Sequence, residues 1–375
     1  MDFEYTEEQR LLAETLRRFL GTGYSFDARA KIMASAAGYS EDVWAALAEM
    51  GVLGVPFDEE HGGYGGSSVD MMIVMEALGE ALVVEPYLAT VGLGGRFVAR
   101  GGSPAQQRRI LPELIQGKMK LAFAQTEPGE RYDLRRVATR ARRTGEGWVL
   151  DGEKRAVLHG GCADLLVVSA RTAGGDGDAG GVSLFLVDRA APGVAVSESR
   201  TIDNLRLADL RLTGVAVPRD ALIGREGGGF DLADEVVDYA TVLLCAEAVG
   251  AMKYAHEATL EYLKTRRQFG VPIGSFQALQ HRMVDILISC EQARSIACLA
   301  AVKIDSAETH ERRRVVSAAK IKIADAARHV SQESVQLHGG MGMTEELKIS
   351  HTFRRLTMIA QAFGDADHHL ARYAH

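Results

Sequence analysis

The apolar residues of this chain repeat with a helical period at both ends and with a strand period in the middle. This order restricts the fold more than any other feature. Leu12, Leu16 and Phe19 recur at spacings of four and three residues, as expected for one face of a helix. Similar spacing covers the first third of the chain and returns after residues 227–229. We therefore expect two helical regions on either side of a β region.

Short β-rich runs separated by Gly and Asp fill the middle of the chain. Four runs have the composition of strands, at residues 148–150, 165–169, 183–187 and 194–197. No helical pattern lies between them, so we expect antiparallel pairing rather than a doubly wound nucleotide fold. The predicted fold is α+β and mostly α: an N-terminal helical domain (1–119), a central antiparallel β-barrel (120–224) and a C-terminal four-helix bundle (225–375).

Composition and charge exclude several classes of protein. Hydrophobic residues make up 47% and charged residues 25% of the chain, the net charge is −7, and the basic residues are scattered. The sequence begins Met1-Asp2-Phe3-Glu4-Tyr5 and contains no run of about 18 apolar residues, so no signal peptide or membrane span is predicted. The cysteines lack the spacing of metal ligands. We expect a cytoplasmic protein with no metal, nucleic-acid or membrane partner.

Two motifs in the C-terminal region have the residue types that hold a nucleotide. Arg266 and Phe269 lie near the end of a predicted helix, where a guanidinium can bind a phosphate and a ring can cover an adenine. Further on, Gln336 precedes Gly339 and Gly340, which permit close approach of the backbone to a ligand. An ordinary helix end and a glycine C-cap would give the same patterns, and both interpretations stay open.

These motifs, together with Gln125-Thr126-Glu127-Pro128, resemble the acyl-CoA dehydrogenase family over essentially the whole chain, in the family's order and spacing. The resemblance implies FAD as cofactor, bound mainly by a neighbouring subunit and completed by the late helices of this one. It implies that Thr126 contacts the flavin ring. The residues implied to contact the ADP half are Arg266, Phe269, Gln277, Gln336, Gly339 and Gly340.

The chain departs from the family pattern around the flavin ring. Thr126-Glu127-Pro128 is retained, but residues 129–133 replace the family's Gly-Ser-Asp ending of that turn. Ala156 and Leu158 stand where the family has tryptophan and threonine. We therefore expect an intact site for the ADP half and a degraded site for the ring.

The family's catalytic glutamate is missing from both places where it normally occurs. The late position falls on Gly364 or Phe363, and the alternative position, with its following arginine, falls on Ala240 and Thr241. Abstraction of an α-proton from a thioester needs a positioned base. The nearest carboxylate belongs to Asp365, which is equally suited to capping the helix that follows it.

The ending Phe363-Gly364-Asp365-Ala366-Asp367-His368-His369-Leu370 resembles one subset of the family, the small subunits of pimeloyl-CoA and steroid-side-chain type dehydrogenases. This implies α,β-desaturation of acyl-CoA, as in fatty acid β-oxidation, in a heterotetramer with a second dehydrogenase-like chain. An electron-transferring flavoprotein would be the electron acceptor. Two alternatives stay open: a self-sufficient homotetramer that uses Asp365 as the base, and a non-catalytic scaffold of the same fold.

Overall fold

A computed structural model describes residues 5–305 and 308–374. Residues 1–4, 306–307 and 375, which belong to the predicted helical domains, lie outside the described residues. The contacts divide the chain into two compact units, and neither is a single stretch of sequence. The first contains residues up to Lys31, Ser68–Val83 and Thr241 onward, and the second contains Ile32–Ser67 and Val84–Ala240. The domain boundaries predicted near residues 120 and 225 stay predictions.

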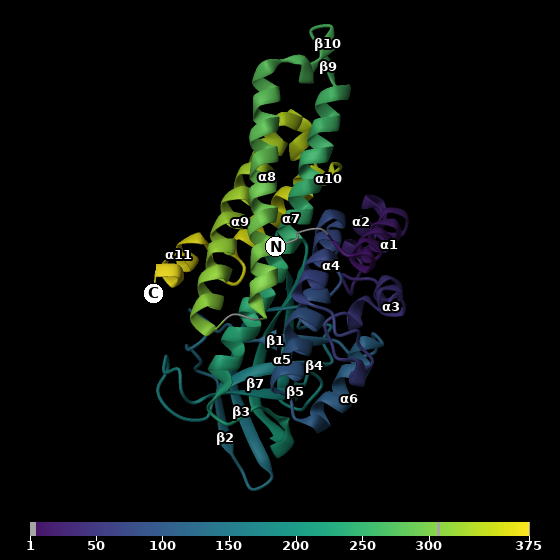
Figure 1. Cartoon of the computed structure of the whole chain (residues 1–375). Coiled ribbons are helices and arrows are strands. Elements are labelled where there is room, and N and C mark those ends of the chain that lie inside the picture. Colours follow the sequence, from purple (N-terminus) through teal and green to yellow (C-terminus); the bar gives the residue numbers. More distant parts are fainter. Residues whose placement is uncertain (1–4, 306–307, 375) are drawn as a thin grey trace. The chain divides into compact units, whose positions relative to one another are not determined.

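Helices occupy the first third of the described chain, as the periodicity predicted. The first begins after Thr6, whose hydroxyl accepts from the backbone N–H of Gln9 while the Gln9 side chain accepts from the backbone N–H of Thr6, a reciprocal cap that satisfies two helix-end donors. The elements are α1 (Glu7–Gly23), α2 (Phe26–Ala34), α3 (Glu41–Glu49), η1 (Val52–Gly54), η2 (Glu59–His61), α4 (Ser68–Ala81), the π-helical η3 (Leu88–Gly95), α5 (Arg96–Gly101) and α6 (Pro104–Ile115) (Figure 1).

The middle of the chain forms a sheet with the strand order β6-β7-β3-β2-β4-β5-β8, and with β1 paired to β4. Its elements are β1 (Leu121–Ala124), β2 (Arg140–Arg143), β3 (Gly147–Leu158), β4 (Leu165–Arg171), β5 (Val182–Asp188), β6 (Val194–Arg200), β7 (Arg206–Pro218), η4 (Arg219–Ala221) and β8 (Leu222–Ile223). The four predicted runs lie in β3, β4, β5 and β6, whereas β7, the longest strand described, was not predicted.

Antiparallel pairing prevails in this sheet, but β4 pairs in parallel with β1 and, at one residue pair, with β2. A parallel pair requires a long connection between its strands. The β2–β3 hairpin lies between β1 and β4 and provides that length. The prediction of antiparallel pairing is therefore wrong for the β1–β4 pair and for the single residue pair between β2 and β4.

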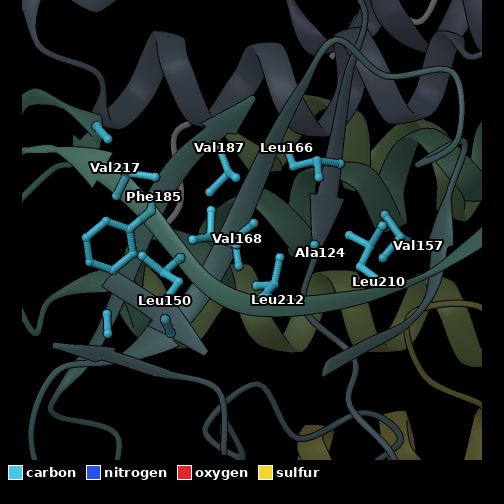
Figure 2. Packing of buried hydrophobic residues seen from close by; sticks show 14 of the residues in the cluster. Ala124, Leu150, Val157, Leu166, Val168, Phe185, Val187, Leu210, Leu212 and Val217 are labelled. Atoms are coloured by element: carbon cyan, nitrogen blue, oxygen red, sulfur yellow. The ribbon is translucent and has the colours of Figure 1, made fainter. Parts of the chain in front are cut away.

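One face of the sheet packs into a hydrophobic core, and Figure 2 shows Leu150, Val168, Phe185 and Leu212 of four strands converging there. Each of these side chains is at most 3% exposed. The Trp148 ring meets the Phe185 ring edge-on at a centroid distance of 5.3 Å. Side chains from β3, β4, β5 and β7 thus meet in one core, which holds the strands that carry the site described below.

The last third of the described chain consists of long helices. They are α7 (Gly229–Thr265), α8 (Gln277–Ile304), α9 (Thr309–His338), α10 (Lys348–Gln361) and α11 (Ala366–Ala374). A hairpin of β9 (Arg267–Gln268) and β10 (Val271–Pro272), followed by η5 (Ile273–Ser275), joins α7 to α8 (Figure 1), and η6 (Gly339–Met343) follows α9. No helix in the described part of the chain is both long enough and apolar enough to span a membrane.

Two glycines let α4 and α7 approach closely within the first unit. A Cβ on Gly79 would lie 2.0 Å from the carbonyl oxygen of Glu247, and one on Gly250 would lie 1.9 Å from that of Glu76. Real Cβ atoms do not come this close to an oxygen, so only glycine permits the observed crossing. The two contacts are reciprocal, and they fix the register of α4 against α7.

Candidate functional site

The hairpin between α7 and α8 presents an aromatic ring and a guanidinium to solvent. Phe269 is 89% exposed and has a backbone φ of 53°, in the left-handed region that a bulky residue rarely adopts. The Arg266 guanidinium has no hydrogen-bond or ion-pair partner within residues 5–305 and 308–374. Exposed apolar side chains can mark interaction sites, and an exposed guanidinium is free to bind an anion, so the hairpin has the composition of a binding surface.

The glycine turn after α9 is equally open. Gly339 adopts a φ of 60° and caps the helix through its N–H to the carbonyl of Gln336. A Cβ on Gly339 or Gly340 would meet nothing within 4 Å, so packing against the described residues does not require glycine at 340. The side chain of Gln336 is exposed. The left-handed φ explains Gly339, and the space around both glycines leaves their backbone accessible.

A ring contact brings the hairpin and the glycine turn together. Tyr262, one helical turn before Arg266, stacks on His338, which directly precedes Gly339, with a centroid distance of 4.5 Å and an interplanar angle of 27°. His338 is held by its Nδ1–H, which donates to the carbonyl of Ser334 at 2.8 Å. Burial lowers the pKa of His338, so a neutral ring is favoured. Two motifs separated by about 70 residues in sequence therefore lie next to each other.

Thr126, the residue implied to contact the flavin ring, lies in the sheet unit on a segment held by buried groups. Its carbonyl accepts from the backbone N–H of Arg155 at 2.7 Å. The Lys154 ammonium donates to the carbonyl of Gln125 at 3.2 Å and to Glu127 Oε1 at 2.7 Å. The Thr126 hydroxyl makes no hydrogen bond to any residue that the structure describes. The backbone on both sides of Thr126 is thus fixed while its hydroxyl stays available.

The ion pair beneath this segment is fully desolvated. Lys154 is 0% and Glu127 4% exposed, and Glu127 also accepts from the backbone N–H groups of Ala138 and Thr139. Burial lowers the pKa of Lys154 to about 8, against the influence of Glu127. Burial also opposes ionisation of Glu127, but the Lys154 charge and the hydrogen bonds outweigh it and lower the pKa of this carboxyl. Both groups are charged at neutral pH.

The strand next to Thr126 carries the two replaced ring contacts. Ala156 is exposed, has a φ of 51°, and lies at a break in the register between β3 and β7. Its N–H donates to Asp209 Oδ1 at 3.0 Å. Leu158 is half-buried and pairs with Leu207. Neither side chain offers the aromatic face or the hydroxyl that the family resemblance assigns to these positions.

The positions implied for the catalytic base carry no carboxylate. Ala240 and Thr241 on α7 are at most 1% exposed. Phe363 and Gly364 form a turn between α10 and α11, with φ values of 56° and 120°. Asp365 Oδ1 accepts from the backbone N–H of His368 at 2.9 Å, which is the geometry of a helix N-cap. A role for Asp365 as base stays a prediction.

Sequence reasoning did not assign roles to Lys154, Tyr262 and His338. Nothing local to Lys154 in the sequence indicates that its acceptors are Gln125, Glu127 and Ser169. Tyr262 precedes Arg266 by four residues, so helical spacing places both on one face. That spacing was the available signal for Tyr262, whereas the contact with His338 depends on the fold.

Three models of acyl-CoA dehydrogenase domains match the chain in order. The N-terminal domain matches residues 6–118, the middle domain 122–215 and the C-terminal domain 227–374. The long-chain specific acyl-CoA dehydrogenase of Sus scrofa mitochondria is 30% identical over 326 residues, which cover 84% of this chain and 74% of that protein.

Solved structures of similar proteins have the same fold. The ChsE4-ChsE5 complex from Mycobacterium tuberculosis gives a TM-score of 0.90 at 28% identity, over 100% of this chain and 98% of that chain. The FAD complex of PigA gives a TM-score of 0.92 at 27% identity, with the same coverage. Domain order, identity and structural similarity agree over the full length, and the chain belongs to the acyl-CoA dehydrogenase family.

Proposed function

We propose that this chain is a small subunit of an FAD-dependent acyl-CoA dehydrogenase, of the pimeloyl-CoA or steroid-side-chain type. It completes a flavin site that belongs mainly to a partner chain with the same fold. The reaction is the α,β-desaturation of an acyl-CoA thioester. An FAD-dependent function of the acyl-CoA dehydrogenase type follows from family membership, and the division of labour between two chains is the proposal.

The observation that carries the proposal is the contrast between an open nucleotide surface and a missing base. Arg266 lacks a partner among the described residues and Phe269 is 89% exposed. The late base position holds Gly364 or Phe363, and the alternative position holds Ala240. An unpaired guanidinium, an exposed ring and an accessible glycine backbone fit the pyrophosphate and adenine of FAD. The chain therefore retains the means to bind the cofactor and lacks the means to abstract a proton.

Each half of the site would contribute differently to the reaction. The Arg266 guanidinium would neutralise the pyrophosphate, the Phe269 ring would cover the adenine, and Gln277 and Gln336 would supply amide donors. Bound FAD supplies the acceptor for the hydride that leaves the β-carbon of the acyl-CoA. The proton at the α-carbon goes to a carboxylate, and we assign that carboxylate to the partner chain. Loss of a general base typically costs about 10²- to 10⁴-fold in rate, so the lone chain should turn over poorly.

The partner is a second acyl-CoA dehydrogenase-like chain, and the expected assembly is a heterotetramer that delivers electrons to an electron-transferring flavoprotein. Support comes from the likeness to the ChsE4-ChsE5 complex at a TM-score of 0.90. The exposed apolar side chains on α8, the hairpin and η6 are compatible with burial against another chain. They are Phe269, Val271, Val284, Leu287, Ile288, Leu299, Met341 and Met343, together with Phe276 directly before α8.

The experiment compares the purified chain alone with the chain co-expressed with a dehydrogenase-like partner encoded beside it. Flavin content is read from the absorbance of released FAD, and catalysis from bleaching of the flavin band by acyl-CoA. FAD and bleaching that require the partner support the proposal. A lone chain that is yellow and bleached at an ordinary enzymatic rate contradicts it.

The strongest rival is a homotetramer in which Asp365 abstracts the proton, because Asp365 is the carboxylate next to the implied base position. It predicts that Asp365→Asn abolishes bleaching while FAD stays bound. The small-subunit proposal predicts that this substitution leaves both bleaching and the cap of α11 largely unchanged, because Oδ1 accepts from the N–H of His368 and an asparagine oxygen also accepts there. Unchanged bleaching in the Asp365→Asn assembly excludes the rival.

A further inference from the structure

The turn between α10 and α11 has an unusual backbone that buried side chains hold in place. Its residues 362–365 include Phe363 at a φ of 56° and Gly364 at a φ of 120°. The second value lies outside the region that residues with a Cβ adopt. A turn of this shape persists only where surrounding groups fix it, and two groups from neighbouring helices do so here.

Lys320 of α9 is the first of these groups. Its side chain is fully buried, and its ammonium donates to the carbonyl of Gly364 at 2.6 Å and to that of Ala360 at 3.2 Å. A hydrogen bond from a charged donor is about twice as strong as one between neutral groups. One buried cation therefore holds both the end of α10 and the middle of the turn.

His369 of α11 is the second group, and its neighbours define its protonation. A carbonyl oxygen can only accept, so Nε2 carries the proton that is donated to Phe363 O at 3.1 Å. Burial, followed by the charge of Lys320, lowers the pKa of His369 to about 3. The ring is therefore neutral, and Nδ1 accepts from the hydroxyl of Ser317 at 3.3 Å. Ser317 lies one turn before Lys320 on α9, so both contacts start from one helix face.

The same arrangement leaves no room for a side chain at residue 364. A Cβ on Gly364 would lie 2.6 Å from His369 Nε2 and 2.6 Å from His368 Cδ2. The φ of 120° would strain any residue other than glycine, whatever the space. The turn in this shape therefore excludes a glutamate at residue 364. Substituting glutamate at 364 alone would clash with the two histidines and strain the backbone.

We infer that Lys320 and His369 are positioning residues that fix the 362–365 turn in a shape open only to glycine at 364. This chain then contributes backbone, instead of a carboxylate, at the place where the family resemblance puts the proton acceptor. The inference rests on the proposed function, which is what makes residue 364 the position of the family's proton acceptor. The clamp itself, meaning Lys320 and His369 bound to the carbonyls of residues 360, 363 and 364, requires neither flavin nor partner.

The clamp should weaken at high pH. Burial lowers the pKa of Lys320 to about 8, against the influence of Cys245 and Asp365. The titratable groups that face Lys320 are Cys245 of α7, Asp365 of the turn and His369 of α11, and burial raises the pKa of the Cys245 thiol to about 12. Lys320 is therefore the group of this set that changes charge near pH 8, and a neutral amine donates more weakly.

The first test is hydrogen exchange on the full chain without flavin, comparing Lys320→Met with wild type. We expect the protection of the peptide covering residues 358–370 to fall at least tenfold, and wild-type protection to fall above pH 8 while that of the variant does not. Lys322→Met is the matched control, because Lys322 binds the exposed Gln292 and should change nothing in this peptide. Equal protection in Lys320→Met and wild type overturns the inference.

Ser317→Ala provides a milder variant in case Lys320→Met does not fold. It removes the hydroxyl that donates to His369 Nδ1 and should lower the protection of the same peptide about threefold. In the flavin-loaded assembly, the rate of flavin reduction should fall above pH 8 for wild type and stay flat for Lys320→Met, with the KM for acyl-CoA unchanged. If the rate of flavin reduction has the same pH profile in wild type and in Lys320→Met, the positioning role of Lys320 is overturned. Failure of the two-chain proposal would leave the exchange result intact, which keeps the two ideas distinguishable.

Discussion

Replacing Lys154 with methionine should destabilise the sheet unit strongly, because it leaves a buried carboxylate without its cation. The substitution keeps the length of the side chain and removes the ammonium that contacts Glu127, Gln125 and Ser169. Glu127 is 4% exposed and cannot turn to solvent. Breaking a buried pair by removing one partner costs about 3–5 kcal/mol, and we expect a loss in this range at pH 7.

Tryptophan fluorescence during urea unfolding is a suitable assay. The chain has two tryptophans, Trp44 and Trp148, and both are buried in the unit that contains Lys154. With a slope of about 2–3 kcal/mol per molar urea, the expected loss moves the midpoint down by roughly 1–2.5 M. The fluorescence transition therefore reports the stability of the relevant unit directly.

The double variant Lys154→Met with Glu127→Gln is the control that isolates charge. It replaces the stranded carboxylate with a neutral amide that still accepts from the backbone N–H groups of Ala138 and Thr139. If desolvated charge causes the loss, the double variant should be more stable than Lys154→Met by about 1 kcal/mol or more. A single variant that loses less than about 1 kcal/mol, or a double variant no more stable than the single, refutes the reasoning.

Three further predictions follow from the site and the packing. Arg266→Ala should weaken FAD retention in the assembled enzyme roughly 10- to 100-fold, since a charged hydrogen bond contributes about 1.5–3 kcal/mol. Arg267→Ala should weaken FAD retention less, because the Arg267 guanidinium already donates to the carbonyl of Gly270. Equal losses of FAD from the two variants in a dialysis assay would contradict the assignment of Arg266 to the cofactor. The folded-state pKa of His369 is depressed from 6.5 to about 3, so its contribution is present above pH 6.5 and is lost as the pH falls toward 3. Between pH 7 and 5 this amounts to about 2 kcal/mol, and denaturant titrations of His369→Gln should show an acid loss smaller by that amount. Gly79→Ala should cost about 1–3 kcal/mol or more through overpacking, whereas Gly21→Ala, where an added Cβ meets nothing within 4 Å, should not destabilise in the same thermal assay.

Periodicity predicted the helical regions and four of the strands, because it depends on neighbours in sequence, but it missed β7. The run at Val43, Ala46 and Leu47 lies in α3, and the run at residues 165–169 lies in β4. Periodicity could not predict the parallel pairing of β1 with β4. The four residues of β1 are all buried, and their pattern does not indicate whether the partner strand runs parallel or antiparallel. Strand pairing depends on how a 40-residue connection is routed, and local pattern does not record that.

The buried charged groups were the part of the site that sequence could not predict. Lys320 stands in Ala-Lys-Ile-Lys, where a lysine on a helix normally faces water. It is buried because carbonyls 40 and 44 residues later accept its protons. Lys154 is buried for the same kind of reason. A residue whose partner lies far away in sequence looks like a surface residue until the fold is known.

The reciprocal glycine crossing of α4 and α7 has a consequence for synthesis of the chain. Ten residues of α4 are buried, most of them apolar, and the helix cannot complete its packing before Gly250 of α7 leaves the ribosome. The two glycines are 171 positions apart, as their residue numbers give. At about 5–20 residues per second this delay is roughly 10–30 s. During that interval a nascent helix of this composition is a natural substrate for chaperones.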